Sequence, residues 1–235
     1  MSDRPVFHRG VIQVAGVRDA AEARLLLACG VRWLGFPLRL AVHAPDLSEA
    51  AAAALIHELP PEAIPVLITY LAEADAILTL ARCLGVRAVQ LHGEIATPEL
   101  EKLRGAAPEL FLIKSLILRP DTARPPVEEL RRHEPWVDAF ITDTFDPATG
   151  AAGATGKTHD WALSRAVVAA TARPVILAGG LTPDNVAAAI GAVQPAGVDV
   201  HTGVEDPVSG AKSPDLVRAF VANARTAFAA GQSGK

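Results

Sequence analysis

Several short apolar runs in this sequence end in residues that can transfer protons. Asp143 ends one run, and His92 and His201 end two others. Burial at a partly dry position raises the pKa of a carboxylic acid, which suits it to donate a proton near neutral pH. An imidazole titrates in the same range. The pattern predicts acid–base chemistry with Asp143 as the acid. The alternative for Asp143 is a carboxylate that caps a neighbouring loop, and the alternative for His92 is a buried, hydrogen-bonded core residue.

Two runs are followed by glycines. Gly179 and Gly180 follow one run, and Thr202 and Gly203 follow the run that ends at His201. Glycine lets backbone N–H groups approach a ligand closely, and a pair of such turns on the last strands of an α/β barrel is a common phosphate site. The spacing therefore predicts phosphate binding, with tight turns as the plain alternative, and a role for His201 next to the ligand.

Other polar residues are weaker candidates for the site. Lys114 lies within an apolar run, where we expect it to point into the sheet interior or toward its mouth and bind an anion or orient Asp143. Arg39 and His43 follow the second run and belong to a solvated loop or reach an anionic group. The stretch GAAGATGKT is not a P-loop, because Ala151 stands where that motif needs glycine. We expect a mobile loop there, with glycine hinges.

These candidates must be positioned by eight short apolar runs rich in Val, Ile and Leu, at residues 11–16, 33–38, 64–69, 88–92, 110–116, 139–144, 174–180 and 197–203. The runs are continuous rather than alternating, which is typical of parallel strands covered on both faces. Helical segments separate them. Gly30 and Gly85 are expected to end two helices, Ser48 to cap a third, and Thr182 with Pro183 to begin a fourth.

Eight strand–helix units in 235 residues predict an α/β fold, a single-domain (β/α)8 TIM barrel over residues 1–235, with residues 1–10 and 230–235 as terminal tails. A doubly wound open sheet is the competitor, but the first turn lacks the Gly-rich dinucleotide fingerprint. In a barrel the carboxyl ends of the strands meet at one face, so the polar residues above are expected to share one site.

Composition limits the classes of partner that the protein is expected to bind. The chain is 50% hydrophobic with a net charge of −4, which argues against nucleic acid and anionic membranes as partners. The start of the chain does not resemble a signal peptide and no long apolar span is present, so we expect a cytoplasmic protein. Two isolated cysteines predict neither disulfides nor a zinc site. We expect no metal.

The later strands carry a specific resemblance. The stretches AVQLHG, FLIK, TDT, GATGKTHDW, PVILAGGLTPDNV and PAGVDVHTGVE together resemble the phosphoribosylanthranilate isomerase family of tryptophan biosynthesis. The similarity is strongest from residue 89 to 205 and weak before about residue 60. It implies a (β/α)8 barrel without metal or organic cofactor that carries out an Amadori rearrangement of an N-ribosyl phosphate. A general acid opens the sugar ring, and a general base removes the C2 proton.

The resemblance also assigns residues by position. Asp143 matches the general acid of the family, and Gly180 and Gly203 match its phosphate-binding turns, together with Gly179 and Thr202 beside them. Gly156 and Lys157 fall in its mobile loop.

The start of the chain departs from the family pattern. The family motif Lys-x-Cys-Gly, whose Cys is the general base, is replaced by residues 13–16, with Ala15 at the position of the Cys. A Ser-Pro-Arg segment, whose Arg meets the anthranilate carboxylate, is replaced by residues 43–46. His201 stands where the family has a small or amide residue. The acid and the phosphate end are kept, whereas the base and the anthranilate end are altered.

We therefore expect an isomerase that acts on an N-ribosyl phosphate or related sugar phosphate. Asp143 is the expected acid, and His201, His43 and His92, in falling order, are candidates for the base. The alternatives are an inactive phosphosugar-binding relative, and an isomerase, epimerase or lyase on another phosphorylated sugar that uses Lys114. The expected partner is a small phosphorylated sugar, and the protein is expected to be a monomer or a homodimer.

Overall fold

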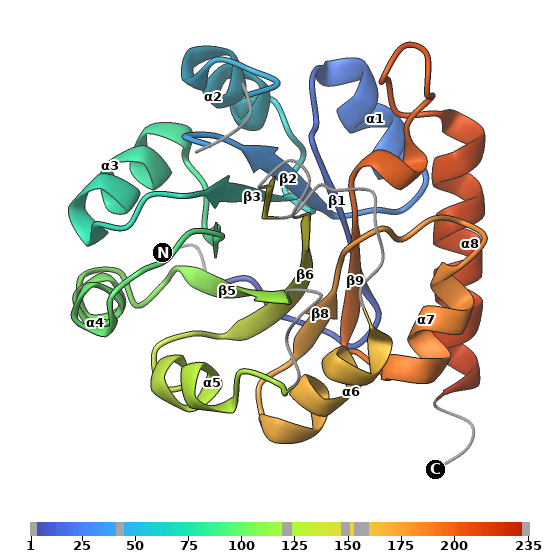
Figure 1. Ribbon diagram of the computed structural model, residues 1–235. Helices are drawn as coiled ribbons and strands as arrows, with labels where there is room; N and C mark the ends of the chain where they lie inside the picture. The colour runs from blue at the N-terminus through green and yellow to red at the C-terminus, as the bar shows by residue number, and fades with distance from the viewer. Residues whose placement is uncertain (1–3, 41–44, 119–123, 147–150, 153–159, 232–235) are drawn as a thin grey trace.

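The protein is a closed barrel of parallel strands (Figure 1). The computed structural model describes residues 4–40, 45–118, 124–146, 151–152 and 160–231. The strands of the ring are β1 Val11–Ala15, β2 Trp33–Pro37, β3 Ile64–Thr69, β4 Ala88–Leu91, β5 Phe111–Leu118, β6 Ala139–Asp146, β8 Val175–Leu177 and β9 Gly197–Val200. Pairing of β5 with β6 and of β1 with β9 closes the ring. The predicted fold class is confirmed.

Helices surround the ring on its outer side (Figure 1). They are α1 Ala20–Ala28, α2 Glu49–His57, α3 Ala74–Leu84, α4 Thr97–Ala106, α5 Val127–His133, α6 Trp161–Ala170, α7 Val186–Val193 and α8 Pro214–Ala230. A short 3₁₀ helix, η1 Thr202–Val204, follows β9. Within the described ranges, no helix is long and apolar enough to cross a membrane.

Three of the four predicted helix boundaries are confirmed. The Ser48 side chain accepts a hydrogen bond from the Ala51 N–H at the start of α2. Gly30 and Gly85 follow α1 and α3 with positive φ angles of 81° and 71°, which glycine adopts without steric cost.

The predicted start of α7 is wrong. This helix begins at Val186, not at Thr182 and Pro183. The Asn185 side chain accepts a hydrogen bond from the Thr182 N–H and donates one to the Gly180 carbonyl, both at 2.9 Å. These bonds hold residues 180–185 in a turn before the helix begins.

A two-residue strand, β7 Ala151–Ala152, pairs antiparallel with the end of β6. The sequence did not indicate it, because two residues carry no periodic pattern. The rest of the predicted mobile loop, including Gly156 and Lys157, lies outside the described residues, and so does His43.

Successive side chains along each strand point to opposite faces of the sheet, so the buried core forms two clusters. One buried cluster lies between the strands and the helices, and a smaller one fills the barrel interior. At the amino-terminal end of the interior, Trp33 and Phe111 meet edge to face with ring centroids 5.3 Å apart, and Phe7 packs against both. These aromatic rings fill the amino-terminal end of the barrel interior, whereas a pocket opens at the carboxyl ends of the strands.

Candidate active site

The inward side chains near the carboxyl ends of the strands differ around the ring. On β4, β5, β6 and β9 they are polar, and we call this set the polar arc; its members are Gln90, His92, Ser115, Asp143, Asp199 and His201. On β1, β2 and β3 the last inward side chains are small or apolar, and we call that set the apolar arc; its members are Ala15, Gly35 and Ile68. One layer deeper, β1 carries the polar Gln13 at the level of Asp199. Because successive strand side chains point to opposite faces, each arc follows from the register of its strands.

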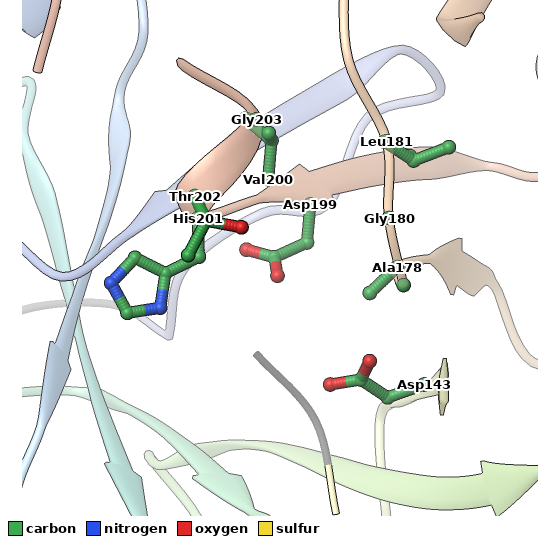
Figure 2. A pocket seen from close by; sticks show the side chains of 10 residues that line it. Asp143, Ala178, Gly180, Leu181, Asp199, Val200, His201, Thr202 and Gly203 are labelled. Carbon is green, nitrogen blue, oxygen red and sulfur yellow. The ribbon is translucent and has the colours of Figure 1, made fainter. Parts of the chain in front are cut away.

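A pocket opens between the ends of β6, β8 and β9 (Figure 2). Its lining residues come from the three strand ends and the turns that follow them: Asp143, Ala178, Gly179, Gly180, Leu181, Asp199, Val200, His201, Thr202 and Gly203. The structure therefore brings the predicted acid, the two predicted glycine turns and His201 to one place.

The two glycine turns touch one another. Gly179 and Gly180 have φ angles of 93° and 62°. A Cβ atom at Gly203 would overlap the carbonyl oxygen of Leu181, so the turn after β9 packs directly on the turn after β8. The Asn185 side chain holds the first turn through its hydrogen bonds with Thr182 and Gly180. The backbone of both turns therefore lines the pocket, as an anion site made from main-chain N–H groups requires.

Asp143 is held as a buried carboxyl group. Its exposed fraction is 6%, and one carboxyl oxygen accepts a 2.7 Å hydrogen bond from the Thr144 N–H. Burial raises the pKa of Asp143, while the charge of His92 and the Thr144 N–H oppose the rise. The raised pKa favours the protonated form, which a general acid needs.

Asp199, on β9, is a second buried carboxyl group in the same pocket. Burial and the charge of Asp143 raise its pKa to about 7, while Gln13 and Lys212 act in the opposite direction. Its Oδ1 atom has no hydrogen-bond partner among the described residues. Sequence reasoning missed Asp199, although the signal was present: in GVDVH it has the same alternation as His201, so both face the interior.

His201 stands at the rim of the pocket on the side of β1. Its Nε2 atom lies 3.4 Å from Glu205 Oε1. A Cβ atom at Gly16, where φ is 75°, would overlap the imidazole ring. The buried Lys212 ammonium donates to the His201 carbonyl at 3.2 Å and to Glu205 at 2.7 Å. These contacts fix the ring between the end of β1 and Glu205.

His92 belongs to a chain of hydrogen bonds inside the barrel. Its Nδ1 atom lies 3.0 Å from Ser115 Oγ, and the Gln90 amide links Ser115 to Gln13 on the opposite strand. The Tyr70 ring packs on the imidazole at a centroid distance of 4.9 Å. Burial raises the pKa of Tyr70 to about 12, so its phenol stays neutral. His92 lies in the interior beside the site, in the position of a hydrogen-bonded wall residue.

The predicted position of Lys114 is corrected, and of the two readings of Arg39 the structure agrees with the solvated loop rather than with a contact to the ligand. Lys114 does not point into the barrel: it alternates with the inward residues of β5, faces α5, and its ammonium lies 3.8 Å from Glu129 and donates to the Ser115 carbonyl at 2.6 Å. Arg39 is exposed, has a φ angle of 55°, and its guanidinium pairs with Glu49 at the start of α2. Neither residue lines the pocket.

The pocket holds groups for proton transfer and for anion binding. In the part of the chain that the structure describes, no three His, Cys, Asp or Glu side chains gather as metal ligands. The arrangement suits a phosphorylated substrate whose phosphate sits on the glycine turns and whose reacting carbons lie between two carboxyl groups.

Known proteins are similar to this chain in sequence and in fold. Residues 35–223 match the family model described as N-(5'-phosphoribosyl)anthranilate isomerase. A Haloferax volcanii isomerase of that name is 40% identical over 217 residues, covering 92% of this chain and 93% of the relative. Isomerase 2 of Methanosarcina mazei is 36% identical over 219 residues, covering 92% and 95%. A solved phosphoribosyl anthranilate isomerase in complex with reduced 1-(o-carboxyphenylamino)-1-deoxyribulose 5-phosphate has a TM-score of 0.73 and 26% identity, covering 92% and 99%.

Proposed function

The chain belongs to the N-(5'-phosphoribosyl)anthranilate isomerase family, and we propose that it catalyses the Amadori rearrangement of N-(5'-phosphoribosyl)anthranilate in tryptophan biosynthesis. One observation carries this proposal: a buried carboxyl group with a raised pKa, Asp143, shares a pocket with two touching glycine turns. The solved relative that holds a reduced product analogue supports a phosphorylated sugar as the ligand.

The geometry supports a role for each part of the pocket. The turns at residues 179–181 and 202–203 would receive the 5'-phosphate on their backbone N–H groups. Protonated Asp143 would donate its proton to the ring oxygen as the bond from that oxygen to C1 breaks, which leaves an iminium at C1. Removal of the C2 proton then gives an enolamine, which becomes the aminoketose.

One feature favours a second function. Ala15 replaces the Cys of the motif that the sequence resembles, and a methyl group accepts no proton. This favours a phosphosugar-binding protein without turnover. Both functions need the phosphate turns, so binding alone does not separate them.

Turnover separates the two functions. The test is the decay of phosphoribosylanthranilate fluorescence with the purified chain, with inorganic phosphate as a competitor. Decay that is proportional to enzyme concentration and inhibited by phosphate supports the isomerase. No decay, together with protection of the chain from thermal unfolding by the reduced product analogue, would establish the binding protein instead.

A further inference from the structure

The proposed reaction needs a base to remove the C2 proton, and Ala15 cannot serve. We propose that the Asp199 carboxylate is this general base, so that proton transfer at C2 is carried out from β9 rather than from β1. This inference rests on the proposed function and names a catalytic residue for it.

The position of Asp199 is the first argument. Its side chain lines the pocket that holds Asp143 and both glycine turns, and in Figure 2 its carboxyl group and that of Asp143 face a common space. Asp199 precedes Thr202 and Gly203 by only a few residues on the same strand end. A sugar phosphate anchored on these turns therefore has its carbon chain directed between the two carboxyl groups.

The unpartnered oxygen is the second argument. The Asp199 carboxyl group is 8% exposed and has a side-chain hydrogen bond with Gln13, yet its Oδ1 atom has no hydrogen-bond partner among the described residues. Buried polar atoms in proteins are nearly always paired, and an unpaired one calls for an explanation. An oxygen kept available for a substrate proton provides one.

The charges around Asp199 are the third argument. From β1 it faces the neutral amide of Gln13, its direct partner in the strand register; from β6 it faces Asp143; and the ammonium of Lys212 acts from the loop before α8. With His201 on its own strand, these are the polar and charged groups that the described part of the chain places around Asp199. The result is a pKa of about 7, near the operating pH at which a general base is most effective.

Two of the three candidate histidines, His92 and His201, lie among the described residues, and each has contacts of its own. The Nε2 atom of His201 lies beside Glu205 and Gly16, at the rim of the site. His92 has its Nδ1 atom against Ser115 and its ring against Tyr70. These contacts hold His201 at the rim of the site, whereas the charge of His92 acts on Asp143, which places His92 beside the acid.

The proton balance closes with the two carboxyl groups. Asp143 gives its proton to the ring oxygen as the C1–O bond breaks. Asp199 takes the C2 proton, the C–H electron pair forms the C1=C2 bond, and the iminium nitrogen becomes an amine. Asp199 then returns its proton to C1 while Asp143 accepts the proton of the 2-hydroxyl group, which gives the ketone. No oxidant or reductant is needed, and both groups regain their starting states.

The test uses Asp199→Asn, which keeps the size of the side chain, with the exposed Asp215→Asn as the matched control. We expect kcat with phosphoribosylanthranilate to fall about 10²- to 10⁴-fold in Asp199→Asn, with unchanged affinity for the reduced product analogue. A substrate deuterated at C2 should show a larger isotope effect on kcat in the variant than in the wild type. Asp215→Asn should match the wild type.

A second variant tests whether the pKa of Asp199 sets the pH dependence of kcat. In Gln13→Lys, an ammonium placed beside Asp199 stabilises its carboxylate, so the acidic limb of the kcat profile should move to lower pH by about one unit or more. The same change in Asp199→Asn should leave no such shift. These readouts respond to a base and not to a role in packing alone.

The outcomes are distinct. A wild type that does not turn over overturns the proposed function, and the base assignment with it. If the wild type turns over and Asp199→Asn keeps more than a third of kcat, the base assignment alone is overturned. The same holds if the acidic limb of the kcat pH profile does not shift in Gln13→Lys.

Discussion

The polar arc and the apolar arc belong to one ring but have opposite chemistry. The polar arc places two buried carboxyl groups at the pocket, beside the two glycine turns. In the apolar arc, Ala15 lies so close to Gly35 that a Cβ atom on the glycine would come within 2.9 Å of the Ala15 Cα atom and 2.8 Å of Ile68. One side of the mouth is equipped for proton transfer, and the other is packed tightly.

This difference places the departures from the family motif in space. The motif that the sequence resembles has Lys and Cys where this chain has Gln13 and Ala15, and both positions lie on β1. Gln13 is the register partner of Asp199, so the neutral amide removes a positive charge that would hold the pKa of Asp199 low. A substitution on β1 therefore alters the pKa of a carboxyl group on β9. The two arcs differ in composition, but the contact between Gln13 and Asp199 links the strands that carry them.

The largest expected effect tests the acid of the polar arc. Asp143→Asn keeps the shape of the side chain but removes the acidic proton, and we expect kcat to fall about 10²- to 10⁴-fold. Fluorescence decay of phosphoribosylanthranilate measures this loss, and binding of the reduced product analogue checks that the pocket is intact. A variant that keeps more than a third of kcat would place the acid outside the polar arc.

The next effect concerns stability and pH. The pKa of Asp199 is raised to about 7 in the folded protein, against about 4 in the unfolded chain. The folded state binds this proton more tightly, so between these values the free energy of unfolding falls as pH rises, by up to about 1.4 kcal/mol per pH unit. Asp199→Asn removes this contribution, so the variant should gain stability relative to the wild type as pH rises from 4 to 7.

Urea unfolding at pH 5 and pH 7.5 measures this difference. The Asp215→Asn control, on an exposed side chain, should follow the wild type at both pH values. An Asp199→Asn variant whose stability tracks the wild type at both values would show that burial of this carboxyl group has no energetic cost.

A smaller effect tests the phosphate turns. In Gly203→Ala the new methyl group overlaps the Leu181 carbonyl oxygen, so the two turns must separate. We expect KM for the phosphorylated substrate to rise roughly tenfold, which is about 1.4 kcal/mol of binding. Gly191→Ala in α7 is the control, because a methyl group there meets no atom within 4 Å. Equal KM values in the two variants would separate phosphate binding from these turns.

The smallest effect is expected in the apolar arc. If Asp199 is the base, a thiol at position 15 adds little, and Ala15→Cys should change kcat by less than about threefold. Steady-state fluorescence decay of wild type and variant side by side measures it. A gain of tenfold or more would show that the apolar arc lacks a group that the reaction needs, and the two arcs would then share the chemistry.

The parts predicted from sequence were those with a local signal. The eight apolar runs predicted the barrel, and the position of glycines and of Asp143 at the ends of runs predicted residues that the structure gathers in one pocket. Lys114 was misplaced because the run FLIKSL is apolar on both faces, so its pattern does not show which face Lys114 occupies. Only pairing with the neighbouring strands settles this, and pairing is a long-range property.

Asp199 and Asn185 were missed for different reasons. Asp199 lies inside an apolar run, where it reads as one polar residue among valines, and its environment depends on β1 and β6. Asn185 forms side-chain hydrogen bonds with Thr182 and Gly180. These bonds belong to a turn, whereas the sequence had predicted that the helix begins at Thr182 and Pro183. In both cases the role of the residue follows from neighbours that the sequence does not place beside it.

The closure of the ring between β1 and β9 also bears on how the chain is synthesised. The ribosome releases β1 early, but β9, one of its two neighbours, is made after all the other described strands. Until then one edge of VIQVA has no partner, and an unpaired apolar edge is a template for pairing with other chains. Synthesis of β9 is thus also the step that covers this edge, and a product truncated before β9 keeps it exposed.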